Sequence, residues 1–107
     1  MTASTGTLDL TITTETYSGA QGSYVGTLYV SITRPDFTPQ SRRQVWTAIG
    51  YGTTLATTSL AIQDGTGGGP TYTLTAPSNG VIRFTNTFAS AVVVDMMFVG
   101  TKGLGST

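Results

Sequence analysis

Five carboxylates are the side chains of this 107-residue chain whose type could support acid–base chemistry: Asp9, Glu15, Asp36, Asp64 and Asp95. Glycoside hydrolysis would need two of them to converge at a separation of roughly 5 to 9.5 Å. Each is isolated in the sequence, and Asp36 and Asp64 fall in turn-like segments, where an aspartate commonly accepts a hydrogen bond from nearby backbone. The chain contains no His and no Cys, which excludes an imidazole base, a thiolate nucleophile and a soft metal site. We therefore expect no enzymatic activity, no cofactor and no metal.

A glycine-rich segment at 65–69 (GTGGG) superficially resembles a phosphate-binding loop. Such loops work because their glycines lead into a helix whose N-terminal amides hold the phosphate. Here Pro70 and a strand-like segment follow, so we interpret residues 63–70 as a flexible loop. Five acidic and five basic residues give a formal net charge of zero, and the longest apolar run, residues 91–94, is far too short to span a membrane. We expect neither nucleic acid nor a membrane as a partner.

Trp46 is the single tryptophan, and with the five tyrosines it could line a platform for sugars, because aromatic rings offer flat apolar faces with a polar edge. The alternative is that Trp46 fills the core or a subunit interface, where tryptophan is enriched. Trp46 shares one face of its segment with Gln44 and Ala48, and the alternation does not tell which face is buried. We favour the core or an interface.

The composition indicates β-structure. Threonine accounts for 23 of the 107 residues, whereas Asp, Glu, Lys and Arg together make up 9% of the chain. Threonine is β-branched, which suits a pleated strand, and its hydroxyl can face solvent. A surface kept polar by hydroxyls and carrying no net charge has little electrostatic repulsion between copies, so such a chain tends to associate.

Apolar residues alternate with a period of two along most of the chain, which predicts antiparallel strands wet on one face. We expect one domain over residues 1–107, an antiparallel β-sandwich of jelly-roll type with seven or eight short strands and with flexible ends at 1–6 and 100–107. Asn79-Gly80 predicts a hairpin turn, and a slip of phase between Leu55 and Leu60 predicts a bulge. The expected strands are 7–13, 24–33, 43–50, 55–62, 71–75, 81–87 and 92–99.

The last expected strand is apolar on both faces. We expect one face, beginning at Val92, to meet Ile82 and Phe84 of the preceding strand in the core. The other face carries Val93, Asp95, Met97 and Val99, and a hairpin between the last two strands would place Arg83 diagonally from Asp95. An outer face this apolar predicts a subunit interface, where charges are depleted and methionine is enriched.

Several features together resemble the small all-β virion proteins of tailed bacteriophages, in particular the capsid decoration (cement) proteins. They are the Thr-lined first strand at 8–13 (LDLTIT), the C-terminal hairpin at 78–100, an N-terminus without a secretory signal, and the absence of Cys and His. The resemblance implies a small sandwich, often trimeric, that is made in the host cytoplasm and sits on the capsid surface. Its partner would be the major capsid protein, and the adjacent Arg42 and Arg43 could contact an acidic patch there. Two other functions stay open: a receptor- or carbohydrate-binding module, and a tail, head-completion or fibre domain.

Overall fold

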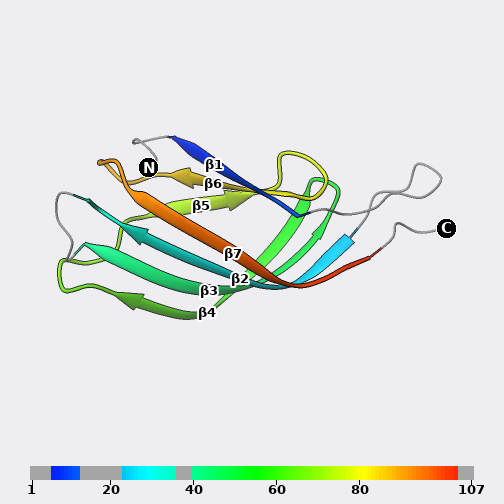
Figure 1. The fold of residues 1–107 in the computed structure, drawn as a ribbon, viewed down its shortest axis with the longest axis horizontal. Coiled ribbons are helices and arrows are strands. Elements are labelled where there is room, and N and C mark those ends of the chain that lie inside the picture. The colour runs from blue at the N-terminus through cyan, green and yellow to red at the C-terminus, as the bar shows by residue number, and fades with distance from the viewer. Residues whose placement is uncertain (1–5, 13–22, 36–39, 104–107) are drawn as a thin grey trace.

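The structure is a computed structural model that describes residues 6–12, 23–35 and 40–103, the side chains of 101–103 excepted. These residues form two antiparallel sheets packed as layers, with no helix among them (Figure 1). The predicted all-β sandwich is therefore confirmed. The seven strands are β1 (Thr7–Thr11), β2 (Ser23–Thr33), β3 (Ser41–Tyr51), β4 (Thr54–Asp64), β5 (Tyr72–Thr75), β6 (Val81–Asn86) and β7 (Val93–Gly103).

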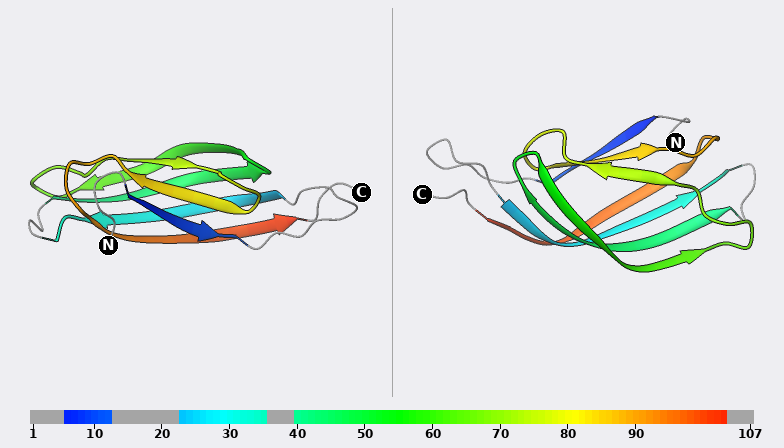
Figure 2. Two further views of the ribbon diagram at one scale, coloured as in Figure 1. Left: turned by 90° about the horizontal axis from the view of Figure 1, so that it is seen from above. Right: turned by 180° about the vertical axis from the view of Figure 1, so that it is seen from behind.

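The smaller sheet has the strand order β1-β6-β5 and the larger one the order β4-β3-β2-β7. β2, β3 and β4 form a meander, the chain then crosses to the smaller sheet for β5 and β6, and β7 returns to lie beside β2 (Figure 2). This spatial order, in which a fourth strand lies beside the first of three consecutive ones, is a Greek key. The four strands of the larger sheet have eleven residues each, so this sheet extends well beyond the smaller one.

The core fills the space between the layers because one face of each strand is apolar. Both sheets contribute fully buried side chains, and the inward faces of β2 and β6 supply most of them. The buried apolar residues are Ile12, Tyr24, Leu28, Val30, Ile32, Ala48, Ile82, Phe84 and Val92. Trp46 packs against this cluster, as the core interpretation predicted.

Two local predictions are confirmed. In β4 the register shifts so that Val45 lies opposite Ala61 and Trp46 opposite Ser59, which leaves Leu60 as the extra residue of a bulge. The turn between β5 and β6 has Gly80 at a φ of 74°, a conformation that glycine adopts without strain. The predicted loop at 63–70 is shorter than expected, because β4 runs through Asp64 and only the following residues turn.

The expected hairpin between β6 and β7 is wrong. β6 pairs with β1 and β5, whereas β7 pairs with β2 in the other sheet. The connection is shaped by Asn86, which is fully buried: its Nδ2 donates to the carbonyl of Ser90 at 2.9 Å, and its Oδ1 accepts from the amide of Phe88 at 2.8 Å. These bonds fold the chain over from one layer to the other. Ile82 therefore reaches the core from the opposite sheet.

The C-terminal boundary also differs from the expectation. β7 continues through Gly103 and pairs with β2 over eleven positions, so residues 100–103 are strand. At the other end, the carbonyl of Gly6 accepts a hydrogen bond from the amide of Asn86 at 2.9 Å. The remainder of both expected flexible ends, 1–5 and 104–107, lies outside the described residues, as does Thr13 at the end of the first expected strand.

Candidate functional site

The candidate site is the outer face of the larger sheet, meaning the side that points away from the smaller sheet. Alternation along β2, β3 and β7 sends every second side chain to this face, and no described element covers it. Seven large apolar side chains on it are between 41% and 56% exposed, although a solvated strand face is ordinarily polar. They are Val25, Tyr29, Ile49, Tyr51, Val93, Met97 and Val99.

The strand register aligns these side chains in rows across the sheet. In one row Tyr29 lies between Val45 and Met97, and Val45 lies opposite Ala61; we call these four residues the apolar row. The neighbouring row, which we call the charged row, consists of Asp95, Ser31, Arg43 and Gln63 in the strand order β7-β2-β3-β4. The two rows line a shallow hollow of about 640 Å³ on the outer face.

The structure separates the seven residues that the sequence offered as interface candidates. Val93, Asp95, Met97 and Val99 lie on the outer face with Arg43, as their alternation in β7 and β3 requires. Arg42 and Arg83 do not.

Arg83 points outward from the smaller sheet and pairs with Asp9 on β1. Its Nε donates to Oδ1 of Asp9 at 2.8 Å and its Nη2 to Oδ2 at 3.1 Å. The predicted proximity of Arg83 and Asp95 is therefore wrong, because β6 and β7 belong to different sheets.

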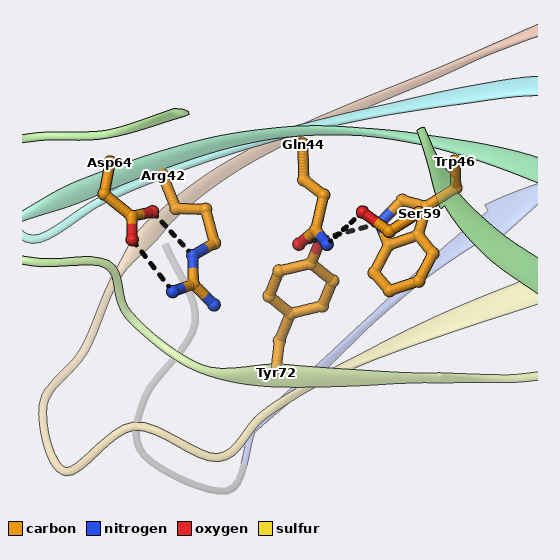
Figure 3. Close-up of polar contacts among 6 residues, drawn as sticks. All are labelled: Arg42, Gln44, Trp46, Ser59, Asp64 and Tyr72. Atoms are coloured by element: carbon orange, nitrogen blue, oxygen red, sulfur yellow. Dashed lines mark hydrogen bonds and ion pairs between the residues drawn. The ribbon is translucent and has the colours of Figure 1, made fainter. Parts of the chain in front are cut away.

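Arg42 points to the inner side of β3, at the open edge of the sandwich. It donates from Nε to Oδ1 of Asp64 at 2.7 Å and from Nη2 to Oδ2 at 3.1 Å (Figure 3). A side chain at Gly69 would collide with both partners, so the loop after β4 closes tightly over this pair. Arg42 is thus held within the domain, and the adjacent arginines point to opposite sides of the sheet.

Next to this pair, a chain of hydrogen bonds ties the two sheets together. Trp46 Nε1 donates to the Tyr72 hydroxyl at 2.7 Å, and that hydroxyl donates to Oε1 of Gln44 at 2.6 Å. Gln44 in turn donates from Nε2 to Oγ of Ser59 at 3.0 Å. Figure 3 shows Tyr72 rising from β5 toward the side chains of β3. Trp46 is thereby turned inward, and a sugar platform on the surface would lack it.

The Tyr72 hydroxyl connects Trp46 to Gln44 in this network. Burial raises the pKa of Tyr72 to about 12, although the hydrogen bond from Trp46 works in the opposite direction. The phenol is therefore neutral at physiological pH and both accepts and donates. Its chemical role is structural, since it accepts from Trp46 and donates to Gln44 within the fold.

The Tyr72→Phe substitution is expected to lower the free energy of unfolding by about 1 to 2 kcal/mol, because it leaves the Trp46 N–H and the Gln44 carbonyl without their shared partner. Urea unfolding followed by tryptophan fluorescence measures the loss. Thr73→Val, at the next position of β5 and facing solvent, serves as the control and should change stability little. Equal stability of Tyr72→Phe and the wild type would contradict the role assigned to the network.

Acid should weaken the fold through the two aspartate–arginine pairs. The hydrogen bond from Arg83 lowers the pKa of Asp9, and the one from Arg42 lowers the pKa of Asp64. A carboxylate whose pKa is lowered by folding contributes stability above its unfolded pKa of 3.8, and that stability is lost as the pH falls through the folded pKa. We expect the thermal midpoint to fall below pH ~4 and the double variant Asp9→Asn/Asp64→Asn to show a shallower fall. Identical acid profiles would contradict this assignment.

Other chemistry is sparse in the described part of the chain. There, no three acidic side chains come close enough together to hold a metal ion. No helix among the same residues is long and apolar enough to cross a membrane.

Comparisons with known proteins concern the fold. No protein-family model matches the sequence, and no curated protein matches it significantly. Among solved structures, the chain is similar to the crystal structure of the Acinetobacter phage vB_ApiP_P1 tailspike protein, with a TM-score of 0.61 and 18% sequence identity. The match covers 96% of this chain and 20% of the tailspike chain. This chain therefore spans about a fifth of the length of that protein.

Apart from Arg43 on β3, the sequence indicated only the β7 part of the outer face. The sequence missed four residues of this face: Val25, Tyr29, Ile49 and Tyr51. Threonine and serine occupy other positions on the same face of β2 and β3, and these residue types are typical of a solvated face. A usable signal was present in β3, where Val45 and Ile49 lie on the side opposite Trp46. A segment that is apolar on both faces predicts a second contact surface, as it did for β7.

Proposed function

We propose that this chain is a structural, non-catalytic module of a bacteriophage virion, and specifically a β-sandwich of a tail spike or tail fibre. The observation that carries the proposal is the fold match, which spans 96% of this chain and a limited part of a phage tailspike. A sandwich of this kind within a longer spike would serve as a rigid building unit. The proposal corresponds to the tail or fibre domain that the sequence left open as an alternative to a capsid decoration protein.

The surface chemistry supports an assembly role. The chain has no net charge and few ionisable residues, which leaves little repulsion between subunits. The outer face of the larger sheet exposes seven large apolar side chains, and exposed apolar patches mark interaction surfaces. Together these features favour a protein that works by contact with other virion subunits.

The location in the particle tests the proposal. Gold-labelled antibodies raised against the purified chain should bind at the tail of intact phage particles seen by negative-stain microscopy. Pre-adsorbing the antibodies with the purified chain is the control and should remove the label. Absence of the protein from particles, by labelling and by mass spectrometry of purified virions, would contradict any virion role.

A capsid decoration protein is the second candidate, bound to the major capsid protein on the capsid surface. The observation that favours it is the breadth of the outer face, because a wide sheet with few charges can lie flat against a shell. Such binding would stabilise assembled heads by about 2.7 kcal/mol per site at a hundredfold excess over Kd. Gold label over the head, and a higher thermal rupture threshold of heads that carry the protein, would favour this candidate over the tail role.

A further inference from the structure

The outer face carries one positive and one negative side chain among its described residues, and neither is paired. Arg43 and Asp95 are both exposed, and neither takes part in an ion pair or hydrogen bond with the residues that the structure describes. Both lie in the charged row, directly on either side of Ser31. Their Cα atoms are two strand spacings apart, roughly 10 Å, and the two side chains do not contact each other across Ser31.

This spacing makes the face complementary to itself. Ser31 lies on β2, and Arg43 and Asp95 stand at equal distances from it on β3 and β7. Turning a second copy by 180° about an axis along β2 therefore exchanges the two charged positions. Arg43 of each copy then faces Asp95 of the other copy, and the two charges missing a partner in one chain find one in the pair.

The apolar row obeys the same symmetry. The axis along β2 passes at Tyr29, so the tyrosines of two copies meet there, and Met97 of each copy faces Val45 of the other. The hollows of the two copies then face each other across the axis, and Met97, which is unbranched and adaptable, is among the side chains that line them. In this one arrangement, charged side chains face opposite charges and apolar side chains face apolar side chains.

The size of the contact follows from the position of the axis. With the axis along β2, the strands β3, β2 and β7 of the two copies overlap, whereas β4 of each copy lies beyond the sheet of its partner. Strands of eleven residues are about 36 Å long, and three of them side by side are about 14 Å wide, so the overlap has a footprint of roughly 500 Å² on each copy. A standard protein–protein interface buries about 800 Å² on each partner, so this contact belongs with the smaller, weaker interfaces.

From these observations we propose that two copies of this chain pack outer face to outer face about a two-fold axis along β2, joined by two Arg43–Asp95 ion pairs. The pairing goes beyond the proposed function and holds for a tail or a head location alike. It also specifies a two-fold contact in place of the trimer expected from the sequence.

Charge reversal tests the pairing on the 107-residue chain. In sedimentation equilibrium the wild type should have the mass of a dimer. Arg43→Asp alone and Asp95→Arg alone each place like charges opposite one another, so each should weaken dimerisation by roughly tenfold or more. An equimolar mixture of these two variants restores both ion pairs and should recover the dimer, as should the double variant Arg43→Asp/Asp95→Arg.

A charge placed on the opposite side of the sandwich serves as the control: Thr73→Asp lies on the outward side of β5 and should leave the dimer intact. Circular dichroism and urea midpoints equal to those of the wild type verify that the variants are folded. A monomeric wild type at millimolar concentration, the mass of a trimer, or single variants that dimerise as well as the wild type would each overturn the proposal. So would failure of the mixture to recover.

Discussion

Replacing Phe84 with alanine is expected to lower the free energy of unfolding by about 3 to 5 kcal/mol. Phe84 is fully buried at the centre of β6, and its ring stacks on that of Tyr72 with 5.1 Å between centroids. Removing the ring leaves a cavity between the sheets that the paired strands cannot close. Small domains have a free energy of unfolding of only about 5 to 15 kcal/mol, so this single change would remove a large part of it.

Urea unfolding of the Phe84→Ala and Phe84→Leu variants measures the effect. Leucine fills most of the space, so its loss should be clearly the smaller of the two. The outward neighbour Thr85→Ala is the matched control in the same strand and should change stability little. A loss below about 1 kcal/mol for Phe84→Ala would mean that the two sheets do not pack through this residue.

The strands themselves could be predicted because each depends on local alternation. The segment 24–33 was expected as a strand and β2 spans Ser23–Thr33; the segment 81–87 was expected and β6 spans Val81–Asn86. Threonine on one side and branched aliphatic residues on the other leave little choice of conformation. Gly80 and Leu60 were foreseen for the same reason, since a turn and a slip of phase are local features.

The neighbours of each strand could not be predicted in the same way. Alternation determines which side chains share a face, but it does not state which strand lies alongside. The pairing of β7 with β2 depends on the connection at Asn86, whose buried hydrogen bonds carry the chain between layers. The error over Arg83 and Asp95 follows directly from this missing information.

The candidate site shows the same limit. Met97 stood out because β7 is apolar on both sides, but its row neighbours Tyr29 and Val45 become visible only when the strand order aligns them with it. Arg42 precedes the expected strand 43–50, so the alternation of apolar and polar residues did not indicate on which side of the sheet its side chain lies. Its inward position depends on Asp64, twenty-two residues later in the chain.

The Gly26→Val substitution is expected to separate β7 from β2 and to cost about 3 kcal/mol or more of unfolding free energy. Gly26 lies directly opposite Gly100 in the ladder between β2 and β7. A Cβ at Gly26 would come within 2.6 Å of the Gly100 Cα and would also collide with the Val99 carbonyl and the Phe98 ring. Backbone atoms cannot move aside as a flexible side chain can, so the ladder itself has to open.

Hydrogen exchange locates the damage, and urea unfolding measures its size. In Gly26→Val the amides of β7 should exchange much faster than in the wild type, while those of β6, in the other sheet, should keep more of their protection. Thr27→Val places the same side chain at the next position, on the outer face where a branched residue already stands, and should leave the exchange of β7 unchanged. If Gly26→Val were as stable as Thr27→Val, with β7 still protected, the close approach of β2 and β7 at their paired glycines would not be needed to hold β7 in the sheet.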